Sequence, residues 1–271
     1  MKLNWIFENQ ASKRLMTFPT RRMAAVKAAM IHLLVSLAIS VAIAVLIFFI
    51  WFPFPYRDLA GGRALFWIIL GVDVVSGPLL TAVIFSPSKS KKELTLDILL
   101  VALIQISALG IGIKTLYQAR PVYLVFEVDR FCVITASDIY SEKLQPEIGG
   151  LHTLPNTGPK LISTRAAINS QEYLESLELS LKGIAPSMRP DWWQPYENSK
   201  EEVLKRAKPI RTLFEKNTEN QIPINQAINN IKISPDLLGW LPVISFRSFE
   251  WVALIDKRSA EIITFVPVDG F

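Results

Sequence analysis

Few side chains in this 271-residue sequence have the types and spacing that catalysis or metal binding requires. There is one cysteine, Cys132, and there are two histidines, His32 and His152. These numbers exclude a disulfide within the chain, a cysteine-based zinc site and a histidine cluster. The sequence also lacks a glycine-rich phosphate loop and the GxSxG, HExxH and CxxC motifs. We therefore expect no metal, no cofactor and no enzymatic activity, and we interpret Cys132 as a small buried hydrophobic residue.

The most informative polar residue is Asp73, which interrupts an otherwise apolar run at 64–85. That run is long enough for a transmembrane helix, and a charged side chain near its middle costs at least about 2.5–3.5 kcal/mol. Asp73 must therefore be paired, hydrogen-bonded or protonated. Gln105 and Ser40 have similar depths in two other apolar runs, so the three side chains are predicted to meet near the bilayer centre. Ser40 also continues a four-residue spacing with His32 and Ser36.

Three interpretations of these intramembrane polar residues remain open. In the first, Asp73 is neutral or hydrogen-bonded to Gln105 and holds three helices together. In the second, Asp73 meets the transmembrane segment of a client protein. A proton or ion path is the third, and it is the weakest because the membrane segments offer no second acid or basic partner at this depth.

Three apolar runs are long enough to cross a bilayer, in a sequence that is 51% hydrophobic with a mean hydropathy of +0.31. They cover residues 28–52, 64–85 and 95–117. This pattern predicts a membrane protein with a sizeable water-soluble part. The first run is too long for a cleaved signal peptide. Gly77-Pro78 is predicted to break the second run.

Basic residues predict the orientation of these runs. Lysine and arginine gather in residues 1–27 and in the loop 86–94, whereas the loop 53–63 has only Arg57 and Arg63. The positive-inside rule then places the N-terminus in the cytoplasm and everything after about residue 118 in a bacterial periplasm. The net charge of +5 therefore reflects membrane orientation, and we expect no nucleic acid partner. An aromatic belt at the outer surface is predicted from Trp51, Phe52, Phe54, Tyr56, Phe66 and Trp67.

The expected organisation has three parts: a basic cytoplasmic N-terminus (1–27), a three-helix transmembrane region (28–118) and a periplasmic α+β domain (119–271). The domain is expected to contain an antiparallel sheet that ends in a C-terminal hairpin. Its predicted elements are a buried strand at 121–133, a loop at 141–168, helices at 170–181 and at 198–214 with a break at Pro209, and hairpin strands at 251–255 and 261–266.

Two pairs in the soluble part are candidate binding residues. Asp129 and Arg130 follow a strand just outside the membrane. Adjacent strand residues point to opposite faces, so we expect no acid/base dyad between them, and we favour a capping or salt-bridge role at the membrane surface. A pocket lined by both and by other polar groups would instead favour an enzyme. Trp192 and Trp193 are either a binding anchor or, as we favour, packed in the core or against the membrane surface.

Several segments resemble one family, the type IV pilin accessory proteins of the TfpX/TfpZ kind. They are IHLLVSLAIS (31–40), WFPFPY (51–56), LGVDVVSGPLLTAVIF (70–85), LDILLVALIQISALGIGIKTLYQARPVYLVFEVDRF (96–131) and ALIDKRSAEIITFVPVDGF (253–271). The resemblance implies an inner-membrane, chaperone-like factor that supports production, stability or assembly of type IV pilin, with no catalytic residues.

Physical reasoning then suggests how such a factor works. Asp73, Gln105 and Ser40 would pack against the pilin helix, and the outer domain, with Asp129, Arg130, Trp192 and Trp193, would hold the pilin head. The alternative is a membrane-tethered periplasmic sensor or ligand-binding module. That alternative needs a cytoplasmic output, for which the short cytoplasmic segments leave little room.

Overall fold

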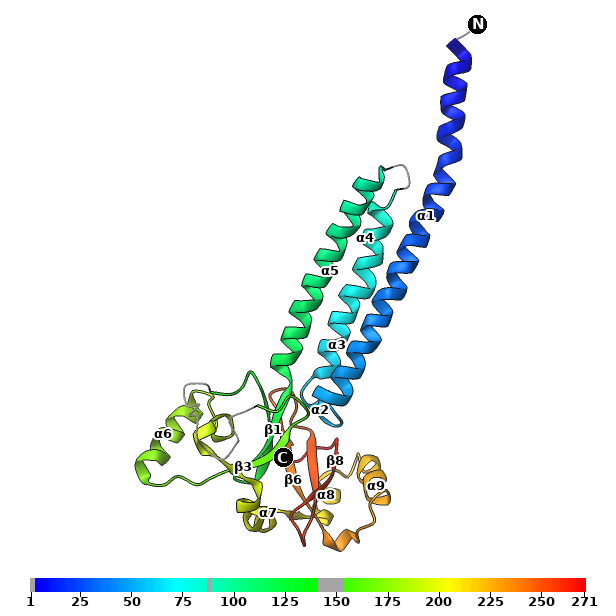
Figure 1. Ribbon diagram of the computed structural model, residues 1–271. Coiled ribbons are helices and arrows are strands. Elements are labelled where there is room, and N and C mark those ends of the chain that lie inside the picture. The colour runs from blue at the N-terminus through cyan, green and yellow to red at the C-terminus, as the bar shows by residue number, and fades with distance from the viewer. Residues whose placement is uncertain (1–2, 87–88, 141–153) are drawn as a thin grey trace. The chain divides into compact units, whose positions relative to one another are not determined.

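The computed structural model describes residues 3–86, 89–140 and 154–271, with side chains from residue 22 onward (Figure 1). The chain forms two compact units. One is Met1–Leu46 with Ala64–Leu116, and the other is Ile47–Arg63 with Tyr117–Phe271. The first is helical and the second is a mixed α/β unit.

The helical unit contains the three predicted apolar helices. Helix α1 (Leu3–Val45) continues into a π-helical turn, η1 (Leu46–Trp51). The next helix is built from α3 (Gly62–Gly71), the π-helical turn η2 (Val72–Ser76) and α4 (Gly77–Ile84), and the last is α5 (Lys91–Ala119). Three stretches are long and apolar enough to span a membrane: Arg22–Trp51, Gly62–Ile84 and Lys91–Ala119. The three long apolar helices are thereby confirmed, while their insertion and orientation stay predictions.

The predicted break at Gly77-Pro78 is wrong. Gly77 has helical dihedral angles (φ −60°, ψ −58°), and Pro78 occupies the first turn of α4, where a missing N–H is tolerated. The irregularity lies one turn earlier, in η2. There the Ser76 hydroxyl donates to the Val72 carbonyl at 2.5 Å. The helix therefore adapts to proline with a π-helical turn and continues.

The α/β unit is built on one sheet, whose order among the described residues is β4-β3-β1-β2-β6-β7-β8, with β5 paired to β6. The strands are β1 (Pro121–Glu127), β2 (Arg130–Thr135), β3 (Lys160–Thr164), β4 (Trp193–Pro195), β5 (Lys208–Pro209), β6 (Leu238–Ile244), β7 (Trp251–Asp256) and β8 (Ile262–Val266). The helices are α2 (Tyr56–Leu59), α6 (Ser170–Leu181), α7 (Lys200–Arg206), α8 (Ile210–Lys216) and α9 (Ile222–Asn229).

The sheet is mixed, which corrects the expected antiparallel one. The pairs β1–β3 and β2–β6 are parallel, and the other pairs are antiparallel. Parallel pairs need long crossover connections, and such distant pairing leaves no local pattern in a sequence. The C-terminal hairpin β7–β8, the helix at 170–181 and the helix break at Pro209 are confirmed.

Two predicted segments differ from the structure. The strand predicted at 121–133 is a hairpin, because β1 ends at Glu127 and the chain turns through Val128, whose φ of +58° is rare for a β-branched residue. The loop predicted at 141–168 contains β3. The part of that prediction at 141–153 lies outside the described residues.

The first turn of helix α6 holds an ion pair, and this pair leads to a pH prediction. Glu172 pairs with Arg165 at 2.6 Å and accepts the Ile168 N–H, and the Arg165 guanidinium lowers the pKa of Glu172 to about 2. An unfolded glutamate has a pKa of about 4.3, so this stabilisation is complete above that pH and is lost as the pH falls toward 2. We expect Glu172→Gln to lower the melting temperature at pH 7 and to have a vanishing effect near pH 2. A difference that stays constant with pH would contradict this role.

Candidate functional site

The helical unit contains a cluster of polar side chains near the middle of its apolar helices. Asp73 is the middle residue of Gly62–Ile84 and only 9% exposed. Gln105 donates from Nε2 to Ser76 Oγ at 3.3 Å, and His32 Nδ1 lies 2.6 Å from Thr81 Oγ1. Asp73 and His32 are close enough to interact electrostatically. Ser40 is buried on α1, the helix that packs against η2 and α4.

Two oxygen atoms of this cluster have no hydrogen-bond partner within the described part of the chain. They are Asp73 Oδ1 and Gln105 Oε1, and both are buried. The expected hydrogen bond between Asp73 and Gln105 is not among the described contacts, because the Gln105 amide points to Ser76 instead. The cluster therefore presents two unused acceptors at the middle of the apolar helices.

Gly77 permits the close approach that assembles this cluster. A Cβ atom at this position would lie 2.8 Å from His32 Nε2 and 3.2 Å from Gln105 Oε1. Sequence reasoning did not assign His32, Thr81, Ser76 or Gly77 to the site. The four-residue spacing of His32, Ser36 and Ser40 was a usable signal for His32, since such residues share one helix face.

A groove lies beside Asp73 in the same unit, between α3–η2 and α5. Its volume is about 370 Å³, and Asp73 is its one charged lining residue among those described. The other lining residues are apolar or small: Leu65, Ile68, Ile69, Val72, Ala108, Ile111, Gly112 and Thr115. Thr115 satisfies its own hydroxyl by donating to the Ile111 carbonyl at 2.9 Å.

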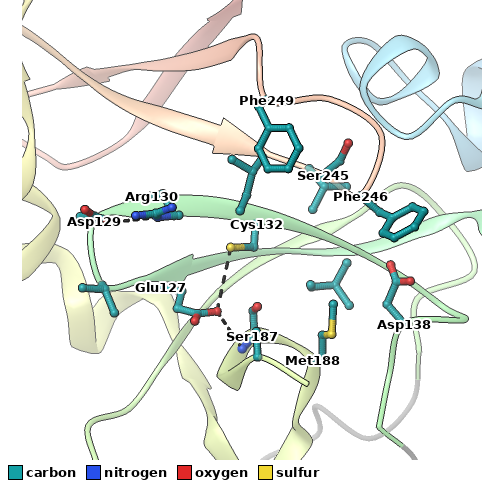
Figure 2. A pocket seen from close by; sticks show the side chains of 15 residues that line it. Glu127, Asp129, Arg130, Cys132, Asp138, Ser187, Met188, Ser245, Phe246 and Phe249 are labelled. Carbon is teal, nitrogen blue, oxygen red and sulfur yellow. Dashed lines mark hydrogen bonds and ion pairs between the residues drawn. The ribbon is translucent and has the colours of Figure 1, made fainter. Parts of the chain in front are cut away.

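The α/β unit has a separate pocket of about 410 Å³, shown in Figure 2. It is bounded by β2, by the 3₁₀ turn η4 (Pro186–Met188) and by the loop after β6, from which Phe246 and Phe249 project. Glu127 Oε2 accepts the Ser187 N–H at 2.9 Å and lies 3.9 Å from Cys132 Sγ. Burial, with Glu127 adding to it, raises the pKa of Cys132 to about 12, so the thiol is protonated at neutral pH.

Asp129 and Arg130 both line this pocket, and they correct one expectation. Their side chains form an ion pair at 2.7 Å, with Arg130 donating from Nε to Asp129 Oδ1. The alternation rule does not apply to them because Asp129 lies in the turn and only Arg130 belongs to β2. Glu127, Asp138, Ser187 and Ser245 add polar groups to a lining that is otherwise largely apolar, so the enzyme alternative stays open. Among the described residues, no cluster of histidine, cysteine or carboxylate side chains could hold a metal ion.

Trp192 and Trp193 are buried, as the packing interpretation predicts. The Trp193 ring packs against Tyr123 at an interplanar angle of 56°, with ring centroids 4.7 Å apart, and its indole N–H donates to the Ser187 carbonyl at 2.8 Å. The guanidinium groups of Arg165 and Arg189 lie over the Trp192 ring at 5.0 and 4.6 Å. Both indoles therefore belong to the core of the α/β unit.

The fold and the two sites define a class of protein: three helices of membrane-spanning length joined to a mixed α/β domain, with a buried acid among the helices and a largely apolar pocket in the domain. Two relatives from Dichelobacter nodosus, fimbrial assembly proteins of serogroups I and E1, are each 36% identical over 252 residues, which cover 93% of this chain and 98% of theirs. A third, from serogroups C1 and C2, is 43% identical over 124 residues, which cover 46% of this chain and 95% of its own. A family model described as fimbrial assembly protein FimB matches residues 20–61.

The chain belongs to this fimbrial assembly protein family. A role in fimbrial biogenesis, which the sequence resemblance implied, is thereby supported. No solved structure matches the chain.

Proposed function

We propose that this protein is an inner-membrane accessory factor that binds the fimbrial subunit, a type IV pilin, and supports its production, stability or assembly without enzymatic activity. Its N-terminus is cytoplasmic and its α/β unit is periplasmic in this proposal. The relatives' printed role as fimbrial assembly proteins supports it. The more specific TfpX/TfpZ-like assignment belongs to the same proposal.

The observation that carries the proposal is the pair of buried acceptors, Asp73 Oδ1 and Gln105 Oε1, which have no partner among the described residues. Lipid provides no hydrogen bonds, so such groups cost free energy until a protein partner satisfies them. A fimbrial subunit held in the same membrane would be the partner that binds beside this polar cluster. The subunit's soluble head would contact the pocket of the α/β unit, where Phe246 is 89% exposed.

The test combines gene deletion with crosslinking in cells. Deletion is expected to lower the amount of the fimbrial subunit or of surface fimbriae, measured by immunoblot and electron microscopy. A photo-crosslinking amino acid at position 72, next to Asp73, is expected to give an adduct recognised by antibody to the subunit, unlike one at the exposed Leu103 on α5. Unchanged fimbriation after deletion would exclude the proposed role.

A second candidate function is a membrane-tethered ligand-binding module, and the 410 Å³ pocket of the α/β unit favours it. A small apolar ligand would fill the space under Phe249 and beside Met188 (Figure 2). The two functions differ in one result. A ligand-binding module would give no subunit adduct from position 72, whereas the accessory factor would give one.

A further inference from the structure

The groove beside Asp73 has the dimensions of two helical turns. Its lining on one side extends from Leu65 to Asp73, eight residues along a helix, which is about 12 Å at 1.5 Å per residue. Large aliphatic side chains at its edges are exposed, at 65% for Ile68 and 68% for Ile111. Gly112 brings α5 close to α3, because a Cβ there would lie 3.0 Å from Ile69 Cγ1.

Asp73 adds a hydrogen-bond acceptor to a groove that is otherwise lined by apolar or small residues. Asp73 is only 9% exposed and lines the groove, and no described residue donates a hydrogen bond to its carboxylate. The other polar lining residue, Thr115, already donates its hydroxyl to a carbonyl of its own helix. A molecule bound in the groove therefore needs a hydrogen-bond donor only opposite Asp73, near the middle of Gly62–Ile84.

This requirement decides between possible occupants. A lipid acyl chain would match the apolar lining but would leave the Asp73 carboxylate without a donor. A transmembrane helix matches the apolar lining equally well, and small residues such as Ala108 and Gly112 favour helix–helix contact in lipid. Backbone N–H groups of a helix are already used, so the donor must be a side chain.

We propose that the groove between α3–η2 and α5 binds one apolar transmembrane helix of the fimbrial subunit, which donates a side-chain hydrogen bond to Asp73. This proposal rests on the proposed function and adds to it the binding face and the chemistry of the partner. The bound helix carries a single donor, such as a hydroxyl, amide or cationic group, level with Asp73. It carries aliphatic or small side chains over the two turns toward Leu65 and Thr115.

The experiment fills the groove without touching Asp73. Ala108→Leu places bulk in the groove, and Gly110→Leu is the matched control on the same helix, because a Cβ at Gly110 meets nothing within 4 Å. Each variant also carries a photo-crosslinking amino acid in place of Ile111. We expect Ala108→Leu to reduce the subunit adduct about tenfold or more, the size of a 1.4 kcal/mol overpacking cost, and Gly110→Leu to leave it unchanged.

The adduct from position 111 in the otherwise unchanged chain tests the proposal even if Ala108→Leu fails to accumulate in the membrane. An adduct with the subunit supports the groove as its binding face. An adduct with lipid alone, or with a second copy of this chain, overturns it. Subunit adducts from Phe249 in the α/β unit, combined with none from position 111, would refute the groove while leaving the proposed function in place. Loss of both, with normal fimbriation after gene deletion, would instead refute the proposed function.

Discussion

Trp240→Ala is expected to lower the free energy of unfolding of the α/β unit by about 3–5 kcal/mol, the usual cost of deleting a buried tryptophan. Trp240 lies on β6 and is 1% exposed, within a cluster that includes Leu213, Leu238 and Leu254. Its indole N–H donates to the Pro209 carbonyl at 3.1 Å and lies 3.0 Å from Thr212 Oγ1. The substitution therefore leaves a cavity and removes two hydrogen bonds where β5, α8 and the sheet meet.

The measurement is thermal unfolding of the full chain in detergent, where the apparent melting temperature should fall by about 10 °C. Trp240→Phe is the matched control, because it keeps most of the ring volume and loses only the N–H. We expect that control to cost about 1–2 kcal/mol. Equal losses in the two variants would show that the hydrogen bonds, and not the buried volume, hold this part of the domain together.

Local patterns explain which parts of the fold could be predicted. The apolar helices follow from run length alone, and the β7–β8 hairpin follows from alternating residues on either side of a polar turn. The β1–β2 turn could not be read in the same way, because Val128-Asp129 lacks the glycine or asparagine that usually marks a turn with positive φ. The parallel pairings of β1 with β3 and of β2 with β6 depend on contacts between distant segments.

The burial of the aromatic residues in segment 47–63 could not be predicted from the sequence either. Its aromatic residues were expected in a membrane-surface belt, yet Phe52 and Tyr56 are buried in the α/β unit. Tyr56 packs edge-on against Phe265 of β8 at 5.9 Å, and the Leu59 carbonyl accepts the Ser245 hydroxyl at 2.5 Å. Composition identifies a segment rich in aromatic residues but does not say whether lipid or protein covers them.

The candidate site could likewise be predicted only in part: the positions of its residues along the helices could be, and their contacts could not. The depth of Asp73 and Gln105 follows from counting residues along apolar runs. Their partners depend on how each helix is rotated about its axis, which Gly77 and the π-helical turn η2 influence locally. For this reason the His32–Thr81 contact and the Gln105–Ser76 hydrogen bond could not be predicted, although each of these residues was visible in the sequence.

Replacing Asp73 should separate stability from function. We expect Asp73→Leu to stabilise the helical unit by up to about 3 kcal/mol, because an acid at the centre of a transmembrane helix is costly and a leucine there is not. The same variant should lose the subunit adduct and surface fimbriae, since it no longer offers an acceptor. Asp73→Asn keeps the shape of the side chain and one acceptor oxygen, so it should retain part of the subunit adduct and of the surface fimbriae.

The measurement pairs the melting temperature of the purified variants in detergent with fimbriation of cells that carry them. A stabilised Asp73→Leu protein without fimbriae would mean that the buried carboxylate is kept for its partner, at the expense of the protein's own stability. A destabilised Asp73→Leu protein would mean that the carboxylate holds the three helices together. A Leu variant with normal fimbriae would remove Asp73 from the binding site, because an unsatisfied acceptor that the partner does not need has no role in recognition.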